Sequence, residues 1–149
     1  MKNYLILFSS SILISILLTN YANSANGLNL ENKQENIVKF SEVESAPFYI
    51  DWCTSNLAED KIRECTDSGI KLFAKQYFNT ELANELKLSG YQRITSAFII
   101  DKNGDVVDIR VRAPHPQLKD EAIRVINLLP KMEPGKVNGK AVSVSYLLP

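Results

Sequence analysis

The clearest alternation of apolar and polar side chains lies between residues 94 and 113. An apolar-rich run at 94–100 precedes the segment 101–105, and a second run follows at 106–113. The segment 101–105 between the two runs contains Asn103-Gly104, a pair that favours the positive φ angles of a tight turn. In the second run, apolar residues alternate with charged ones, which predicts a strand with one buried and one wet face: Val107, Ile109 and Val111 against Asp108, Arg110 and Arg112. The pattern predicts a β-hairpin.

Helical spacing of apolar residues marks two further segments. After Asn56, which with Glu59 has the spacing of a capping box, apolar residues recur at near-helical intervals as far as Tyr77. A second helix is expected from Pro116, a residue suited to the first helical turn, to the residue before Pro130. Its apolar stripe comprises Leu118, Ala122, Val125, Ile126 and Leu129.

Two shorter elements complete the predicted pattern. Residues 81–88 are expected to form a brief helical turn, and residues 142–148 an alternating strand. In this last strand Val142, Val144 and Tyr146 are expected to face the helices, and Ser143 and Ser145 to face outward. Pro134-Gly135 and Asn138-Gly139 indicate turns ahead of it.

The N-terminal residues predict export. One lysine precedes an apolar core of about fifteen residues, which is shorter than the ~20 that span a bilayer. Small residues at Ala22 and Ser24 fit a signal-peptidase site, so residues 1–24 are read as a signal peptide and the mature protein as periplasmic. An uncleaved inner-membrane anchor is the alternative. Residues 25–45 are mostly polar and are expected to form a flexible leader, with room for one short strand at 37–43. Residues 46–149 then form a single domain.

Charge and cysteine content narrow the class. Seventeen basic and seventeen acidic residues balance, and removal of residues 1–24 takes away one lysine, so no basic surface for nucleic acid is expected. The two cysteines, Cys53 and Cys65, are expected to form a disulfide in an exported chain. A metal pair is the competing interpretation, but the single histidine, His115, is distant in sequence.

No residue pattern indicates catalysis, and neither an enzymatic activity nor a cofactor is expected. His115 lies between two prolines and is read as a residue at a helix start. Asp101, Asn103, Asp105 and Asp108 lack the glycine and the final glutamate of a calcium loop. Tyr49 and Trp52 are expected to pack against the disulfide.

The ordered C-terminal motifs resemble the C-terminal domain of TonB. They are Phe98-Ile99-Ile100-Asp101-Lys102-Asn103-Gly104, Glu121-Ala122 within a helix, Leu129-Pro130-Lys131-Met132, Pro134-Gly135-Lys136, Gly139-Lys140-Ala141-Val142 and Tyr146-Leu147-Leu148-Pro149. The resemblance implies an α+β fold, in which an antiparallel three-stranded sheet is built from the hairpin and the C-terminal strand, with helices packed on one face.

The same resemblance implies a function. Members grip a peptide of an outer-membrane receptor or transporter by β-augmentation, and the matching strand here consists of Val142, Ser143, Val144, Ser145, Tyr146, Leu147 and Leu148. The partner is then a TonB-dependent receptor or another envelope protein segment, and a homodimer through the sheet edge is an open alternative. The alternative is a purely structural role, in which this strand is a solvated edge that closes the core.

The segment between the N-terminal apolar run and the domain differs from that of the energy transducers of this family. Residues 19–46 contain no proline and, fully extended, reach only about 90–100 Å. A peptide-docking module is therefore expected rather than a transducer that spans the periplasm. An anchored transducer, and an enzyme or enzyme inhibitor on a small α+β scaffold, remain as alternatives.

Overall fold

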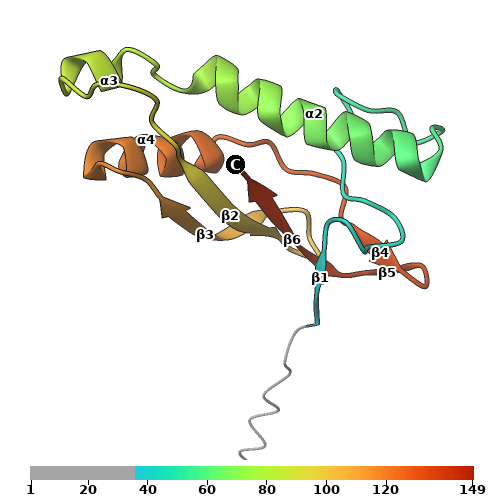
Figure 1. Cartoon of the computed structure of the whole chain (residues 1–149). Helices are drawn as coiled ribbons and strands as arrows, with labels where there is room; N and C mark the ends of the chain where they lie inside the picture. Colours follow the sequence, from blue (N-terminus) through green and yellow to red (C-terminus); the bar gives the residue numbers. More distant parts are fainter. Residues whose placement is uncertain (1–35) are drawn as a thin grey trace, which may run out of the picture. The chain divides into compact units, whose positions relative to one another are not determined.

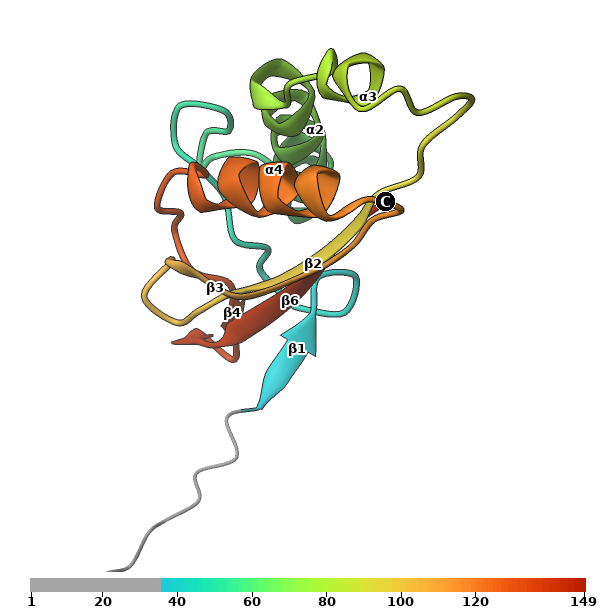
Figure 2. The ribbon, with the colours of Figure 1, turned by 90° about the vertical axis from the view of Figure 1, so that its left-hand side faces the viewer.

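Three helices, a four-stranded mixed sheet and a two-stranded sheet make up the part of the chain that the computed structural model describes, residues 36–149. The predicted signal peptide at 1–24 lies outside this range. The elements in chain order are β1 (Ile37–Lys39), α2 (Glu59–Tyr77), α3 (Leu82–Glu85), β2 (Thr95–Ile100), β3 (Val106–Arg112), α4 (Pro116–Asn127), β4 (Lys136–Val137), β5 (Lys140–Ala141) and β6 (Ser143–Leu148). Both longer helices, α2 and α4, cover the same face of the sheet (Figures 1 and 2). The α+β class is as expected.

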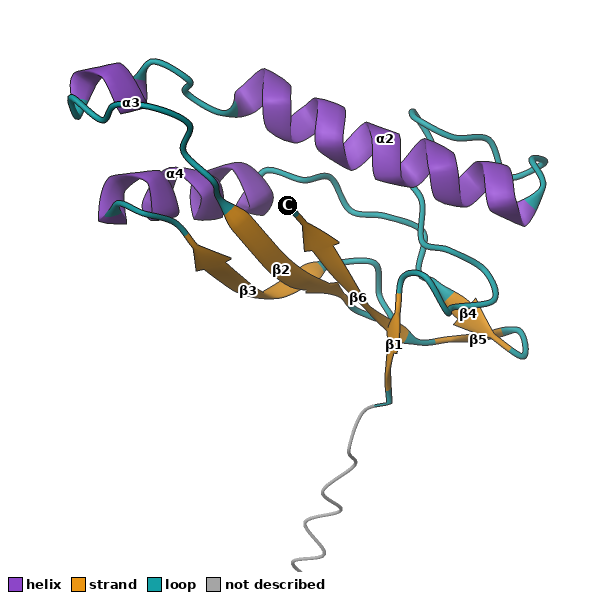
Figure 3. Ribbon diagram, viewed as in Figure 1, coloured by secondary structure: helices purple, strands orange, loops and turns teal. Residues whose placement is uncertain are grey.

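The main sheet has four strands in the order β1-β6-β2-β3 (Figure 3). The three strands β6, β2 and β3 are antiparallel, as expected, whereas β1 adds to β6 in parallel. The expectation of a three-stranded, purely antiparallel sheet is therefore wrong in one strand. The physical reason is that Val38 and Phe40 bury apolar surface against the core, which places their backbone beside β6.

The folded unit also begins earlier than the boundary expected at residue 46. A turn that follows β1 closes through hydrogen bonds from the N–H groups of Glu42 and Val43 to the carbonyl of Lys39. Val43 is 1% exposed and lies in a core cluster with Ala46, Ile62 and Val144. Residues 36–45 are thus part of the packed domain rather than of a flexible leader, and the short strand expected within 37–43 is present as β1.

The hairpin of β2 and β3 forms at the expected turn, but with an irregularity. The register shifts between Ala97 and Ile99, opposite Asp108, whose φ of 50° lies in the left-handed region. Such a bulge adds one residue to β3, so the side-chain alternation changes phase across it. Val106, Ile109 and Val111 pack on the core, and Val107 is 41% exposed. The predicted inward orientation of Val107 is therefore wrong.

The helix starts differ in how closely they follow the sequence. Helix α2 begins at Glu59 after Ala58 and has no side-chain cap, so the capping role expected of Asn56 is wrong. Helix α4 begins at Pro116 as expected, and the Nδ1 of His115 accepts a hydrogen bond from the N–H of Gln117 at 3.3 Å. His115 is a helix cap, in agreement with the structural interpretation of this residue.

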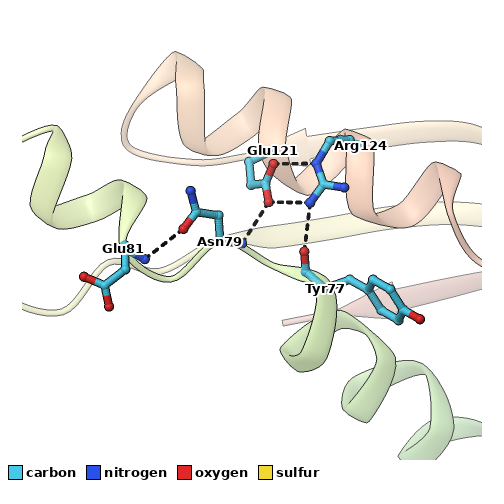
Figure 4. Close-up of polar contacts among 5 residues, drawn as sticks. All are labelled: Tyr77, Asn79, Glu81, Glu121 and Arg124. Carbon is cyan, nitrogen blue, oxygen red and sulfur yellow. Dashed lines mark hydrogen bonds and ion pairs between the residues drawn. The ribbon is translucent and has the colours of Figure 1, made fainter.

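Hydrogen bonds from and to Glu121 and Arg124 of α4 join this helix to the C-terminal end of α2 (Figure 4). The guanidinium of Arg124 donates to the carbonyl of Tyr77 at 2.8 Å and to Glu121 at 2.7 Å. Glu121 also accepts from the N–H of Asn79 at 2.8 Å. The bond from Arg124 to Tyr77 satisfies a carbonyl that the C-terminal end of α2 leaves open. Hydrogen bonds from Arg124 and Asn79 together keep the pKa of Glu121 below its usual range, although burial opposes the shift.

The main core lies between the two longer helices and the sheet. Six buried residues form it: Ile70, Phe98, Ile100, Ile126, Met132 and Tyr146. At its margin the small β4–β5 hairpin turns at Asn138-Gly139, both with positive φ, as the sequence predicts. This arrangement fixes β6 between the helices above and β1 and β2 beside it.

Candidate functional site

The expected docking strand, β6, lies inside the sheet over its first half. β2 pairs with one side along Val144–Leu148, and β1 pairs with the other side at Ser143–Ser145. The expectation that this strand forms an open edge is therefore wrong over residues 143–145. A strand edge becomes a docking site only where its N–H and C=O groups are open.

The backbone geometry shows how much of that edge is left. The N–H of Phe40 donates to the carbonyl of Ser145 at 3.0 Å, so Ser145 directs its polar groups toward β1. Because successive residues of a strand direct these groups to opposite sides, Ser143 and Leu147 face the same way as Ser145. Leu147 lies beyond the end of β1, and no strand among residues 36–149 pairs with it on this side.

Side chains on β6 follow the expected alternation only in part. Val144 and Tyr146 are buried at 0% and 3% exposure and face the helices, as expected. Ser143, expected to face outward, is also buried at 1%, and Ser145 is half-buried. Leu147 is 64% exposed. Leu147 is thus the exposed residue of the strand.

An arginine from α2 fastens the segment that leads away from β1. The guanidinium of Arg63 donates to the carbonyl of Phe40 and, at 2.7 Å, to that of Val43. Its charged group also lies 5.7 Å from the centre of the Phe40 ring. The ring of Phe40 in turn meets that of Tyr146 edge-on at 5.0 Å. Arg63 therefore holds the turn after β1 against both α2 and β6.

Tyr146 links β6 to α2 through its hydroxyl. It donates to Asp67 at 2.7 Å, and Asp67 also pairs with Lys71 at 2.7 Å. Burial, followed by the neighbouring carboxylate, raises the pKa of Tyr146 far above its usual value. Burial alone would raise the pKa of Asp67, but hydrogen bonds from Lys71 and Tyr146 outweigh it and lower that pKa. The carboxylate is thereby kept charged.

A hollow of about 400 Å³ opens next to this group. Its walls come from the end of β1 and the turn after it, from α2, from β2 and from the C-terminal part of β6. They include Phe40, Asp67, Ala97, Tyr146 and Leu147. The open backbone of Leu147 and this hollow therefore lie together, so that a strand added at Leu147 would have a place for a side chain.

The opposite edge of the sheet, β3, is poorly suited to accept a strand. Its bulge at Asp108 interrupts the ladder, and Asp108 pairs with Arg110 at 2.7 Å on the surface. Bulges and charged side chains are the usual means by which proteins prevent pairing at an exposed edge. Arg110 and Arg112 thus lie on a wet strand, as the structural interpretation of these arginines expects.

The expected disulfide is present between Cys53 and Cys65, with Cα atoms 5.9 Å apart. It ties the segment before α2 to the helix. Trp52 lies over Gly69 of α2 and meets Tyr49 edge-on at 5.3 Å. The two aromatic residues therefore pack beside the disulfide-bonded segment and against the main core.

Two other features of the described residues are structural. Asp101 accepts hydrogen bonds from the N–H groups of Asn103 and Asp105 and so organises the hairpin turn. Within residues 36–149, no group of three or more histidines, cysteines and acidic residues has an arrangement that would hold a metal ion. No helix in that range is long and apolar enough to cross a membrane.

Sequence reasoning missed three members of the site: the pairing of β1, the clamp of Arg63 and the acceptor Asp67. The first had a signal, because Ile37–Phe40 is an apolar run in a polar segment. The other two are 23 and 79 residues from the groups they bind, and helical periodicity assigns both simply to the surface of α2.

Comparison with known proteins matches the C-terminal part of the chain, which contains β6 but not β1 or α2. The profile of the Gram-negative bacterial TonB protein C-terminal family matches residues 81–149, which contain β2, β3, α4 and β6. Neither the curated proteins nor the solved structures gave a match. The family is non-enzymatic, is associated with the envelope of Gram-negative bacteria and with TonB-dependent transport, and generally interacts with outer-membrane receptors. Residues 81–149 of this chain, with their hairpin, helix and C-terminal strand, are thus similar to the TonB C-terminal domain family.

Proposed function

We propose that this protein is a periplasmic module that binds an extended peptide segment of an outer-membrane receptor or transporter by β-augmentation along β6. The observation that carries the proposal is that β6 already accepts a strand on the side away from β2. That side therefore has the geometry for strand addition, and Leu147 extends it with an N–H and a C=O that no strand among residues 36–149 pairs with on this side. In such binding, main-chain hydrogen bonds give affinity and side-chain hollows give selectivity.

We choose the β6 edge over the β3 edge because the two edges differ in their suitability for strand pairing. β3 carries a bulge and a charged pair, whereas the open end of β6 carries an exposed Leu147 beside an apolar hollow. An extended peptide that pairs with Leu147 gains backbone bonds without displacing any within the β6–β2 ladder. The same contrast argues against a homodimer through β3.

A titration tests this proposal. Isotope-labelled full-length protein is titrated with peptides from the N-terminal segments of outer-membrane receptors, and amide shifts are followed. We expect shifts concentrated at residues 143–148. Shifts confined to β3, or no binding by any such peptide to the folded protein, would refute the proposal.

Leu147 offers a matched pair of variants. Leu147→Pro removes an N–H that faces away from β2, whereas Leu147→Ala removes the same exposed side chain and keeps the N–H. Because one hydrogen bond contributes about 0.5–1.5 kcal/mol, Leu147→Pro should bind the peptide about two- to tenfold more weakly than Leu147→Ala. Equal affinities would show that this N–H is not used.

Export to the periplasm is the second part of the proposal. The Cys53–Cys65 disulfide supports it, because disulfides persist in oxidising compartments such as the bacterial periplasm. N-terminal sequencing of protein released by osmotic shock should find a start near Ala25. Recovery of intact Met1 in the membrane pellet would favour the anchored alternative instead.

A further inference from the structure

We propose that β1 is an internal occupant of the docking edge, and that the partner replaces it as a parallel strand with apolar side chains at the places of Val38 and Phe40. This inference rests on the proposed function and concerns the regulation and the ligand preference of the same site. The geometric basis is the register of β1, which aligns Val38 with Val144 and Lys39 with Ser145 on the side that a partner needs.

β1 covers most of the β6 edge, so a partner that pairs with the whole edge must displace β1. Ser143, Ser145 and Leu147 direct their backbone groups to this side, and β1 with Phe40 covers the first two of them. A partner that pairs only with Leu147 obtains the bonds of a single residue. A partner that takes the whole edge pairs with all three, and to do so it must displace β1.

β1 has the features of a strand that can leave. It is three residues long, against the five or six typical of strands, and among residues 36–149 it pairs with a strand on one side only. Ile37 is 49% exposed, and the side chain of Lys39 is 71% exposed. Elements with few buried contacts open at a lower free energy than the core does. When Phe40 leaves, Arg63 keeps its hydrogen bond to the carbonyl of Val43, and the displaced segment remains attached at that residue.

The side chains of β1 define what can replace it. Val38 packs against the cluster that contains Val144, and Phe40 packs against Tyr146. Ile37 and Lys39 point the other way and contribute little buried surface. A parallel partner strand that restores these contacts has an aliphatic residue followed, two positions later, by an aromatic or large apolar one.

Two proline variants of β1 allow a comparison between a β6 edge that β1 covers and one that it no longer covers. The N–H of Val38 faces β6 by the same alternation as that of Phe40, so Val38→Pro removes a pairing group from β1. Lys39→Pro is the matched control, because the carbonyl of Lys39 bonds within the turn to Glu42 and Val43 and its backbone therefore faces away from β6. Both variants are made in the full-length chain.

The probe is a synthetic peptide of residues 36–41, added in trans. We expect it to bind Val38→Pro at least about tenfold more tightly than it binds the unmodified chain or Lys39→Pro, because apparent affinity scales with the fraction of open edge. Amide shifts should appear at residues 143–147. A peptide of the same composition with Val38 and Lys39 exchanged places its apolar residue on the wrong face and should bind weakly. Equal affinity for Val38→Pro and the unmodified chain would overturn the inference.

Hydrogen exchange provides a measurement that does not depend on the proline variant folding. In the unmodified protein, the amide of Ser145 faces β1, whereas that of Tyr146 faces β2. If β1 opens by itself, the Ser145 amide should exchange at least about tenfold faster than the Tyr146 amide. Equal rates would mean that β1 leaves only when the domain unfolds, and would overturn the inference.

A receptor peptide in the same titrations distinguishes the inference from the proposed function. Binding of that peptide with equal affinity to the unmodified chain and to Val38→Pro would uphold the proposed function and overturn the role of β1. Binding of the 36–41 peptide to Val38→Pro, with no binding by any receptor peptide, would uphold strand replacement and overturn the proposed function.

Discussion

The hydroxyl of Tyr146 donates a hydrogen bond of 2.7 Å to the carboxylate of Asp67, which joins the proposed docking strand to α2. Tyr146 is also in edge contact with Phe40, the residue that follows β1. The Tyr146 side chain thus contacts the core, Phe40 at the end of β1, and α2, the helix that carries Arg63. A disturbance of this bond is therefore expected to affect stability and the docking edge together.

Removal of the hydroxyl by Tyr146→Phe keeps the ring packing and deletes the bond to Asp67. We expect a loss of about 1–3 kcal/mol in the free energy of unfolding, because the acceptor is charged. The measurement is urea unfolding at neutral pH. An unchanged midpoint would indicate that water replaces the tyrosine without loss.

The same variant should alter the acid dependence of stability. The pKa of Asp67 in the folded protein is lowered from the ordinary value of 3.8, so its contribution is complete above that pH and is lost as pH falls through the folded pKa. In Tyr146→Phe the folded pKa should move back upward, and the acid-induced loss below about pH 4 should become smaller. Carboxyl chemical shifts followed against pH report the Asp67 pKa directly.

The disulfide should contribute measurably to stability. Cys65→Ser opens the bridge between the segment before α2 and the helix, and a loss of about 2–4 kcal/mol is expected. Thermal or denaturant unfolding measures it, with reduced unmodified protein as the comparison. Titration of two free thiols in unreduced, denatured protein would contradict the bridge itself.

Two glycines with positive φ make a matched pair. A Cβ at Gly104, at φ 87°, would overlap the carbonyl oxygen of Met132, whereas a Cβ at Gly139, at φ 72°, would meet no atom within 4 Å. Both alanine variants bear a left-handed backbone cost of about 1–2 kcal/mol. Gly104→Ala should lose at least about 2 kcal/mol more than Gly139→Ala, since the clash is with backbone. Similar losses in the two variants would contradict the close contact of the hairpin turn with Met132.

Gly69 should reverse the usual effect of a helix glycine. Replacement by alanine inside a helix normally stabilises by about 1 kcal/mol. A Cβ at Gly69 would instead overlap the ring of Trp52. We expect Gly69→Ala to destabilise the protein and to shift the fluorescence of Trp52, the single tryptophan, as its ring moves toward water. A gain in stability with unchanged fluorescence would contradict this packing.

Local chemistry in the sequence determined a large part of this protein. Asn103-Gly104 predicted the hairpin, and the two cysteines predicted their bridge. Pro116 predicted the start of α4, whereas its end at Asn127 comes two residues before the one expected from Pro130. These features depend on residues that are close in the chain or on a pairing with few alternatives. The ordered C-terminal motifs also indicated the family that the profile comparison then matched.

Only the tertiary structure decided what lies beside β6. Strand pairing is a contact between residues that are far apart in sequence, and Val38 meets Val144 across more than a hundred residues. The bulge at Asp108, which turns Val107 outward, is equally invisible to a period-two pattern. Alternation tells which face of a strand is buried but not which strand lies next to it. The sequence therefore indicated a docking strand, and the fold alone placed β1 on the edge that a partner would use.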